Sequence, residues 1–124
     1  MLDTDHITRA MALHAEWNSR LREAIESGTS DRTAATIQLD DECELGQWLR
    51  SLPPEDRATA YWTEVHDGHR AVHVAAAEVL ELALAGRGRD AETAMEHGDF
   101  AKASKQLTLA MQSWQDHLAP PACI

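Results

Sequence analysis

Long hydrophobic runs are missing from this sequence of 124 residues, and no apolar stretch approaches the roughly 18 residues that a membrane-spanning helix needs. The opening residues, MLDTDH, carry acid where a signal peptide needs base followed by an apolar stretch. Basic residues are scarce, since 11 Lys and Arg stand against 21 Asp and Glu for a formal net charge of -10. Such a charge repels phosphate backbones and anionic membranes. We therefore expect a soluble, cytoplasmic protein that binds neither nucleic acid nor membranes.

Cysteine, glycine and proline are also few. The two cysteines, Cys43 and Cys123, are too few for a disulfide framework, which favours metal binding or redox chemistry in a reducing compartment. We expect Cys123 to be an exposed thiol without a function. Six Gly and four Pro leave long stretches rich in Ala, Leu, Glu and Arg, a composition that favours helix. The length suits one domain, residues 1–124.

Apolar residues recur at steps of three and four along most of the chain, which is the spacing of an amphipathic helix. With its Gly and Pro breaks, the pattern predicts helices over Thr4–Ser27, from about Asp41 to near Ser51, from Pro54 to just before Gly86, over Asp90–Glu96, and from Asp99 onward. No stretch of useful length alternates as a strand would. The predicted fold class is all-α, an antiparallel four-helix bundle with an additional short helix.

Histidines lie where apolar side chains are expected. Four of the seven, His14, His66, His69 and His73, fall on the predicted core-facing stripes, whereas His6, His97 and His117 are expected at the surface or at helix ends. A buried imidazole needs partners for both ring nitrogens, and a single one is usually a hydrogen-bonded structural residue. Several that converge, together with a thiol on an inner face, favour a metal site instead.

The spacing of these residues reduces the number of candidate metal ligands but does not fix the set. His69 and His73 lie four residues apart and share one helix face, and His66 lies near that face one turn earlier. At about 1.5 Å of rise per residue, His66 and His73 stand roughly 10 Å apart along the axis, too far to share one small ion easily. Cys43 falls in the first turn of the predicted short helix, where backbone N–H groups favour a thiolate. The alternative is that Cys43 is a small buried hydrophobe and Gly46 a packing notch.

At this point the sequence resembles a known family. Residues 43–49, CELGQWL, match the CxLGxWL signature of the chemoreceptor zinc-binding domain, called CZB. The segment HAEW, from His14 to Trp17, is similar to the HxxW element of that family, and His69 with His73 is similar to its paired histidines. The separations also agree, with 29 residues from His14 to Cys43 and 26 from Cys43 to His69. The chain resembles a stand-alone CZB domain.

The resemblance implies a ligand set for one Zn(II) per subunit. Position by position, the ligands would be His14, Cys43, His69 and His73, and three nitrogens with one thiolate complete a tetrahedron. Packing or supporting positions around the metal would be Trp17, Gly46, Trp48 and His66, with the two tryptophans shielding the ion. Carboxylates that could fix the imidazole tautomers are Asp40, Asp41, Glu64 and Asp67. We interpret all four tryptophans, which include Trp62 and Trp114, as core packing.

The resemblance also implies a function. CZB domains are implicated in zinc control of chemotaxis and cyclic-di-GMP synthesis, and some in sensing hypochlorous acid through the zinc-bound cysteine, here Cys43. We expect a homodimer that signals to a separate chemoreceptor or diguanylate cyclase type of partner. One alternative is a structural zinc in an interaction module. The other is a metal-dependent enzyme, which we do not expect, because the sequence has neither HExxH nor the ExxH elements of di-iron bundles.

Overall fold

The computed structural model describes residues 4–29 and 44–118, and these residues are helical apart from short connections. The helices are α1 (Thr4–Ser27), α3 (Glu44–Ser51), α4 (Pro54–Arg57), α5 (Ala60–Leu84), α6 (Gly88–His97) and α7 (Asp99–Leu118). The described part of the chain contains no strand. The predicted all-α class is confirmed.

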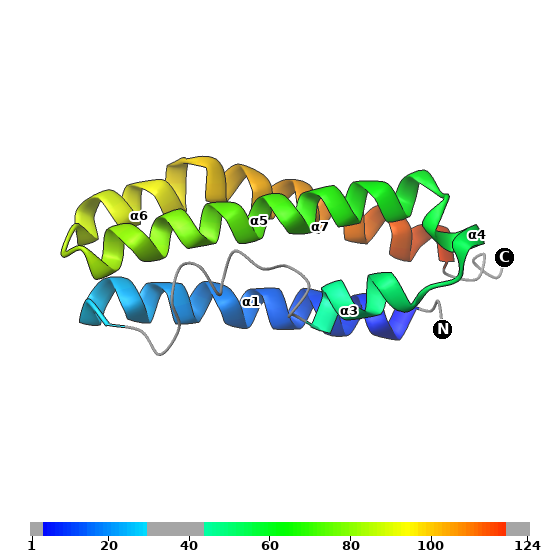
Figure 1. Cartoon of the computed structure of the whole chain (residues 1–124), viewed down its shortest axis with the longest axis horizontal. Helices are drawn as coiled ribbons and strands as arrows, with labels where there is room; N and C mark the ends of the chain where they lie inside the picture. The colour runs from blue at the N-terminus through cyan, green and yellow to red at the C-terminus, as the bar shows by residue number, and fades with distance from the viewer. Residues whose placement is uncertain (1–3, 30–43, 119–124) are drawn as a thin grey trace, which may run out of the picture.

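The helices alternate in direction along the chain, as Figure 1 shows. α1 and α5 run the same way, whereas α3 and the pair α6 and α7 run back. α5 packs most extensively against α7 and α6, and α1 lies against α5, α7 and α6. This packing is compatible with an antiparallel bundle. The count of four bundle helices stays a prediction, because residues 30–43 lie outside the described part.

The core is a stripe of apolar side chains shared by all the long helices. It includes Ile7 and Leu21 from α1, Val65 and Leu80 from α5, and Trp114 from α7, each at most 2% exposed. The predicted core positions of Trp48 and Trp114 are confirmed, and Trp62 is half-buried. Within the described ranges, no helix is both long and apolar enough to cross a membrane.

One predicted helix is divided in two, and the prediction of a continuous helix from Pro54 is wrong. α4 ends at Arg57, and α5 begins only at Ala60. Thr59 separates them with an extended backbone, and its hydroxyl oxygen accepts a hydrogen bond from the Trp62 backbone N–H at 3.2 Å. Such an N-cap satisfies one of the free N–H groups at a helix start, so it favours a new helix over continuation of the old one.

The junction between α6 and α7 depends on a close backbone contact. Gly98 separates the two helices, as its place in the sequence predicts. A Cβ atom added at Gly98 would meet the carbonyl oxygen of Ala94 at 2.8 Å, a distance that real Cβ atoms essentially never show. Only glycine therefore fits here without a shift of the α6 backbone. α6 itself exceeds the predicted range, Asp90–Glu96, by two residues at its start and one at its end.

Candidate metal centre

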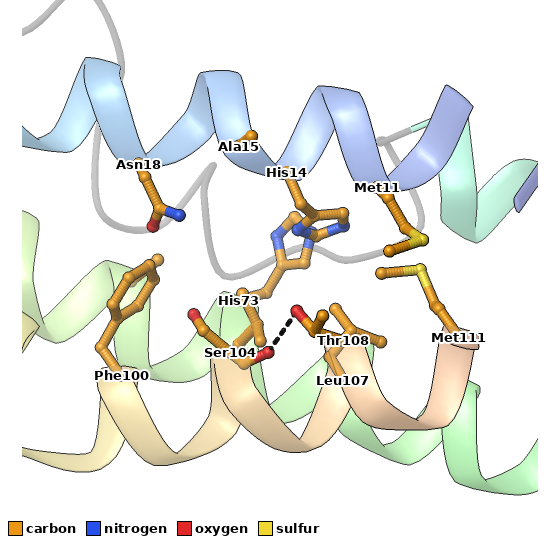
Figure 2. Close-up of a pocket in the computed structure, with 12 residues that line it drawn as sticks. Met11, His14, Ala15, Asn18, His73, Phe100, Ser104, Leu107, Thr108 and Met111 are labelled. Atoms are coloured by element: carbon orange, nitrogen blue, oxygen red, sulfur yellow. Dashed lines mark hydrogen bonds between the residues drawn. The ribbon is translucent and has the colours of Figure 1, made fainter. Parts of the chain in front are cut away.

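Three imidazoles from two helices converge in the middle of the bundle. His14 belongs to α1, and His69 and His73 belong to α5. The ring centroids lie 5.3 Å apart for His14 and His69, 6.3 Å for His14 and His73, and 4.5 Å for His69 and His73, and each pair of rings is close to perpendicular. Figure 2 shows the rings of His14 and His73 directed toward each other between their helices. The structure thus brings together three of the four predicted ligands.

Two of the three histidines of α5, His69 and His73, are the buried polar residues of the described core. His69 is 0% exposed and His73 is 4% exposed. Both face inward because positions four apart lie on one side of a helix, and α5 turns this side, with Val65, Val72 and Ala76, toward its neighbours. Burial of polar rings costs free energy unless they find partners. Two adjacent imidazoles at the centre of an apolar face therefore lower the stability of the fold unless their ring nitrogens have partners.

The ring nitrogens show which partners these histidines have. Nε2 of His69 and Nε2 of His73 lie 2.9 Å apart in a buried hydrogen bond, so one of these nitrogens carries the proton and the other accepts it. Nε2 of His14 is buried and has no hydrogen-bond partner among the described residues. Such a nitrogen costs about 1–3 kcal/mol if nothing binds it. The His14 nitrogen is therefore available to a ligand.

Burial also sets the protonation of this cluster. It lowers the pKa of His14 from 6.5 to about 4, and the nearby His73 adds to the effect. Burial likewise lowers the pKa of His69, with smaller contributions from His73, His14 and His66. A low pKa means that the imidazole is neutral at pH 7 and keeps a lone pair on one nitrogen. Neutral imidazole is the form that binds metal ions.

His66 lies apart from this convergence. Its ring stacks on Trp62, with centroids 4.6 Å apart, and its Nδ1 lies 3.3 Å from a carboxylate oxygen of Asp67. The side chains of Asp67 and Glu64 are exposed. Among the supporting carboxylates that the sequence offered, the one seen to contact an imidazole thus contacts His66, outside the cluster.

α3 supplies packing near the amino-terminal ends of α1 and α5. Gly46 is buried, and Trp48 lies against His6 and Trp114, with ring centroids 5.4 Å and 5.5 Å away. His6 is exposed, as predicted, although its stacking on Trp48 was not foreseen. The side chain of Trp17 and the whole of Cys43 lie outside the described residues, as do Asp40 and Asp41.

No group of three or more His, Cys, Asp or Glu side chains in the described part of the chain has the geometry of a metal site. Tetrahedral zinc with Zn–N distances of about 2.0–2.1 Å holds two ligand nitrogens roughly 3.3 Å apart. The nitrogens of His69 and His73 are closer than this, at 2.9 Å. The donor set still suits zinc, because His69 and His73 are adjacent and inward-facing and the lowered pKa values of His14 and His69 keep these two imidazoles neutral. A small rotation of the His69 or His73 ring would open the required distance.

A cavity of about 230 Å³ adjoins the histidines between α1, α5 and α7. His14 and His73 form part of its wall, and Figure 2 shows its lining. Its polar residues Asn18, Ser104 and Thr108 received no role from the sequence. A signal was present for two of them, since Asn18 follows His14 by four residues, and Ser104 lies between the inner-face residues Ala103 and Leu107.

Comparison with known families gives a match to a family model. The family model described as the chemoreceptor zinc-binding domain matches residues 14–80, which is more than half of the chain. The matched segment begins at His14 and contains Cys43, His69 and His73. No significant match was found among curated proteins, nor among solved structures.

Proposed function

Because the chain belongs to the chemoreceptor zinc-binding domain family, as its signature residues predict, we propose that it is a regulatory domain that binds one Zn(II) per subunit. The fraction of subunits that hold zinc would then depend on zinc availability, on oxidant exposure or on both. The observation that carries this proposal is the convergence of His14, His69 and His73 on one point of the bundle.

The proposed ligands are the three imidazoles and the thiolate of Cys43. Support for the imidazoles is the buried, unpartnered Nε2 of His14 and the lowered pKa values of His14 and His69. Support for Cys43 is its place in the family signature and in the sequence, directly before the first residue of α3. When bound, zinc supplies a tetrahedral cross-link between these segments.

Each ligand would then control how firmly its helix is held. His14 secures α1, the histidine pair secures α5, and Cys43 secures the start of α3. Metal binding requires a thiolate and neutral imidazoles, so zinc occupancy falls when the imidazoles are protonated or the thiol is oxidised. A change in occupancy therefore becomes a change in helix packing, which is a signal that another protein can read.

Cys43 is the proposed redox-sensitive residue. In the net reaction with hypochlorous acid, the thiolate gains the OH group as a sulfenic acid and chloride leaves, so sulfur is oxidised by two electrons and chlorine is reduced by two. A sulfenic acid is a poor zinc ligand, because the donor is no longer a thiolate. Oxidation would thus release the metal and loosen α3.

The proposed partners are a second copy of the chain and a chemoreceptor or diguanylate cyclase type of protein in trans. Apolar side chains on the surface support an interface, since Leu109 is 55% exposed and Leu84 is 42% exposed. A regulatory domain of this kind performs no reaction itself, so the proposal includes no catalytic residue.

One observation favours a second candidate, a structural zinc that never leaves. His69 and His73 are almost completely buried, which slows exchange of a metal they hold. Zinc exchange against a fluorescent chelator separates the two: release within minutes at a free zinc level near the dissociation constant favours a sensor, and retention over days favours a scaffold.

The ligand set is tested by native mass spectrometry of the wild type and single variants. We expect one zinc per subunit in the wild type, with loss or strong weakening in His14→Ala and Cys43→Ala. His66→Ala and His97→Ala are matched controls that should keep the metal, because His66 stacks on Trp62 and His97 is exposed. An equally tight zinc after removal of His14 and Cys43 would reject the assignment. The same spectra report whether the chain is a dimer.

A further inference from the structure

We propose that the cavity between α1, α5 and α7 binds a small, uncharged, mostly apolar molecule that carries one hydrogen-bonding group. This site shares His14 and His73 with the proposed zinc site, since both line the cavity, but its ligand is not the metal. The proposal rests on the size of the cavity, the chemistry of its walls and two half-buried polar side chains, Asn18 and Ser104, that make no hydrogen bond to another described side chain.

The volume fits a single ring with a substituent. The cavity measures about 230 Å³, whereas a dry apolar cavity of about 150 Å³ in another protein is large enough to bind benzene. The additional space corresponds to a few non-hydrogen atoms. A ring of this size would lie between α1 and α7, whose lining side chains face each other in Figure 2.

The walls select against charge. Seven of the twelve lining residues are apolar, namely Met11, Ala15, Val72, Ala76, Phe100, Leu107 and Met111. No Asp, Glu, Lys or Arg lines the cavity. A charged molecule would lose its hydration here without gaining a counter-ion, which is costly. Methionines on two facing helices add polarizable, adjustable surface, which suits rings of varied shape.

Two polar side chains from opposite helices can hold the hydrogen-bonding group. Asn18 on α1 and Ser104 on α7 both line the cavity, and neither side chain makes a hydrogen bond to another described residue. Thr108 differs, because its hydroxyl donates to the Ser104 carbonyl oxygen at 2.9 Å. The Asn18 amide offers both donors and an acceptor, and the Ser104 hydroxyl offers either. A ligand hydroxyl beside either side chain could donate to it or accept from it.

Phenol is the probe that tests these features, with toluene and benzoate as its controls. We expect phenol to bind the full chain saturably, with a dissociation constant on the order of 1 mM or tighter. A ¹H–¹⁵N NMR titration measures this binding. The shifted amides should cluster on the facing parts of α1, α5 and α7. Toluene, which has no hydroxyl, should bind at least about threefold more weakly, and benzoate should not bind, because it is charged.

A matched pair of variants localises the site. Ser104→Leu fills the cavity and removes a polar partner, so it should weaken phenol binding at least about tenfold. Ser113→Leu makes the same change at an exposed position of α7 outside the cavity and should leave binding within about twofold. If Ser104→Leu is unfolded by circular dichroism, Asn18→Leu replaces it with the same expected result.

Metal removal separates this proposal from the zinc site. Wild-type protein treated with a chelator should still bind phenol, since Asn18, Ser104 and the apolar lining residues are not proposed metal ligands. Absence of saturable phenol binding up to about 10 mM, or equal binding by the Ser104→Leu and Ser113→Leu variants, overturns the proposal. Benzoate binding as tight as that of phenol overturns it as well.

Discussion

Two regions of the bundle differ in what fills the space between the helices: one is packed with apolar side chains, and the other holds buried imidazoles and a cavity. Near α6, the end of α5 is packed with small and apolar residues, among them Val79, Leu80 and Ala83, all 1% exposed. In the middle of the bundle, α5 carries His69 and His73 beside a cavity. The first region gains stability from burial, whereas the second loses some through buried polar rings and empty space. Stability and the candidate site are thus separated along one helix.

The largest effect is expected from a change at the α6 end. Leu80→Ala removes a side chain that is 1% exposed and leaves a cavity, so the free energy of unfolding should fall by about 2–5 kcal/mol. Zinc stoichiometry of the folded fraction should not change. Urea denaturation and native mass spectrometry measure the two quantities on one sample. Loss of zinc without loss of stability would break the comparison.

Protonation should weaken the middle of the bundle. The pKa of His14 is about 4 in the folded chain and 6.5 when unfolded, so between these values the unfolded state binds the proton. Stability present above pH 6.5 is therefore lost as pH falls toward 4. In chelator-treated protein, His14 alone should cost about 2 kcal/mol between pH 7 and pH 5.

The control for this pH effect is His14→Leu, which replaces the imidazole with an apolar side chain. Its unfolding free energy, measured in urea at pH 7 and pH 5 without zinc, should depend less on pH than that of the wild type. An unchanged pH dependence in this variant would show that His14 does not stay neutral in the folded chain.

A smaller effect should follow from the start of α5. Thr59→Ala removes the side-chain oxygen that accepts from the Trp62 N–H, and loss of such a cap costs about 1 kcal/mol. The comparison substitution is Thr93→Ala within α6, where the hydroxyl bonds only to the carbonyl of Arg89 in its own helix. Thermal unfolding should give a lower melting temperature for Thr59→Ala than for Thr93→Ala. Equal melting temperatures would contradict the capping role of Thr59.

The smallest effect concerns the ion pair between α1 and α6. Arg22 and Glu96 lie 3.2 Å apart with exposed side chains, so Arg22→Ala should cost less than about 1 kcal/mol, and less still in high salt. Urea denaturation at two salt concentrations checks this. A loss as large as that of Leu80→Ala would mean that charge, and not packing, holds the α6 end.

Local signals in the sequence predicted much of this molecule. Helical spacing and the Gly and Pro breaks placed α1, the end of α3 and the start of α7, because those signals act over a few residues. They failed at Thr59, because Pro54 with its following acids is itself a helix start, and a second start so close looks like helix interior. The neighbouring positions of His69 and His73 follow from their spacing of four.

Contacts between helices were harder to predict from the sequence. The approach of His14 to the α5 pair was implied by the family resemblance, since helix spacing cannot say which helices meet. The cavity forms because the side chains of three helices together do not fill the space between them. A local sequence pattern does not show how side chains from different helices pack. The hydrogen bond between the His69 and His73 rings depends on tautomers, which the sequence does not specify.

The hydrogen bond from the Trp62 indole N–H to the carbonyl oxygen of Leu49, at 2.9 Å, joins the beginning of α5 to α3. An indole in such a position is an intrinsic optical probe. If α3 undocks, Trp62 loses its acceptor and meets more water, and its share of the emission of the four tryptophans should move to longer wavelength. The chain therefore carries its own reporter of whether the cysteine-bearing segment is held, readable without a label.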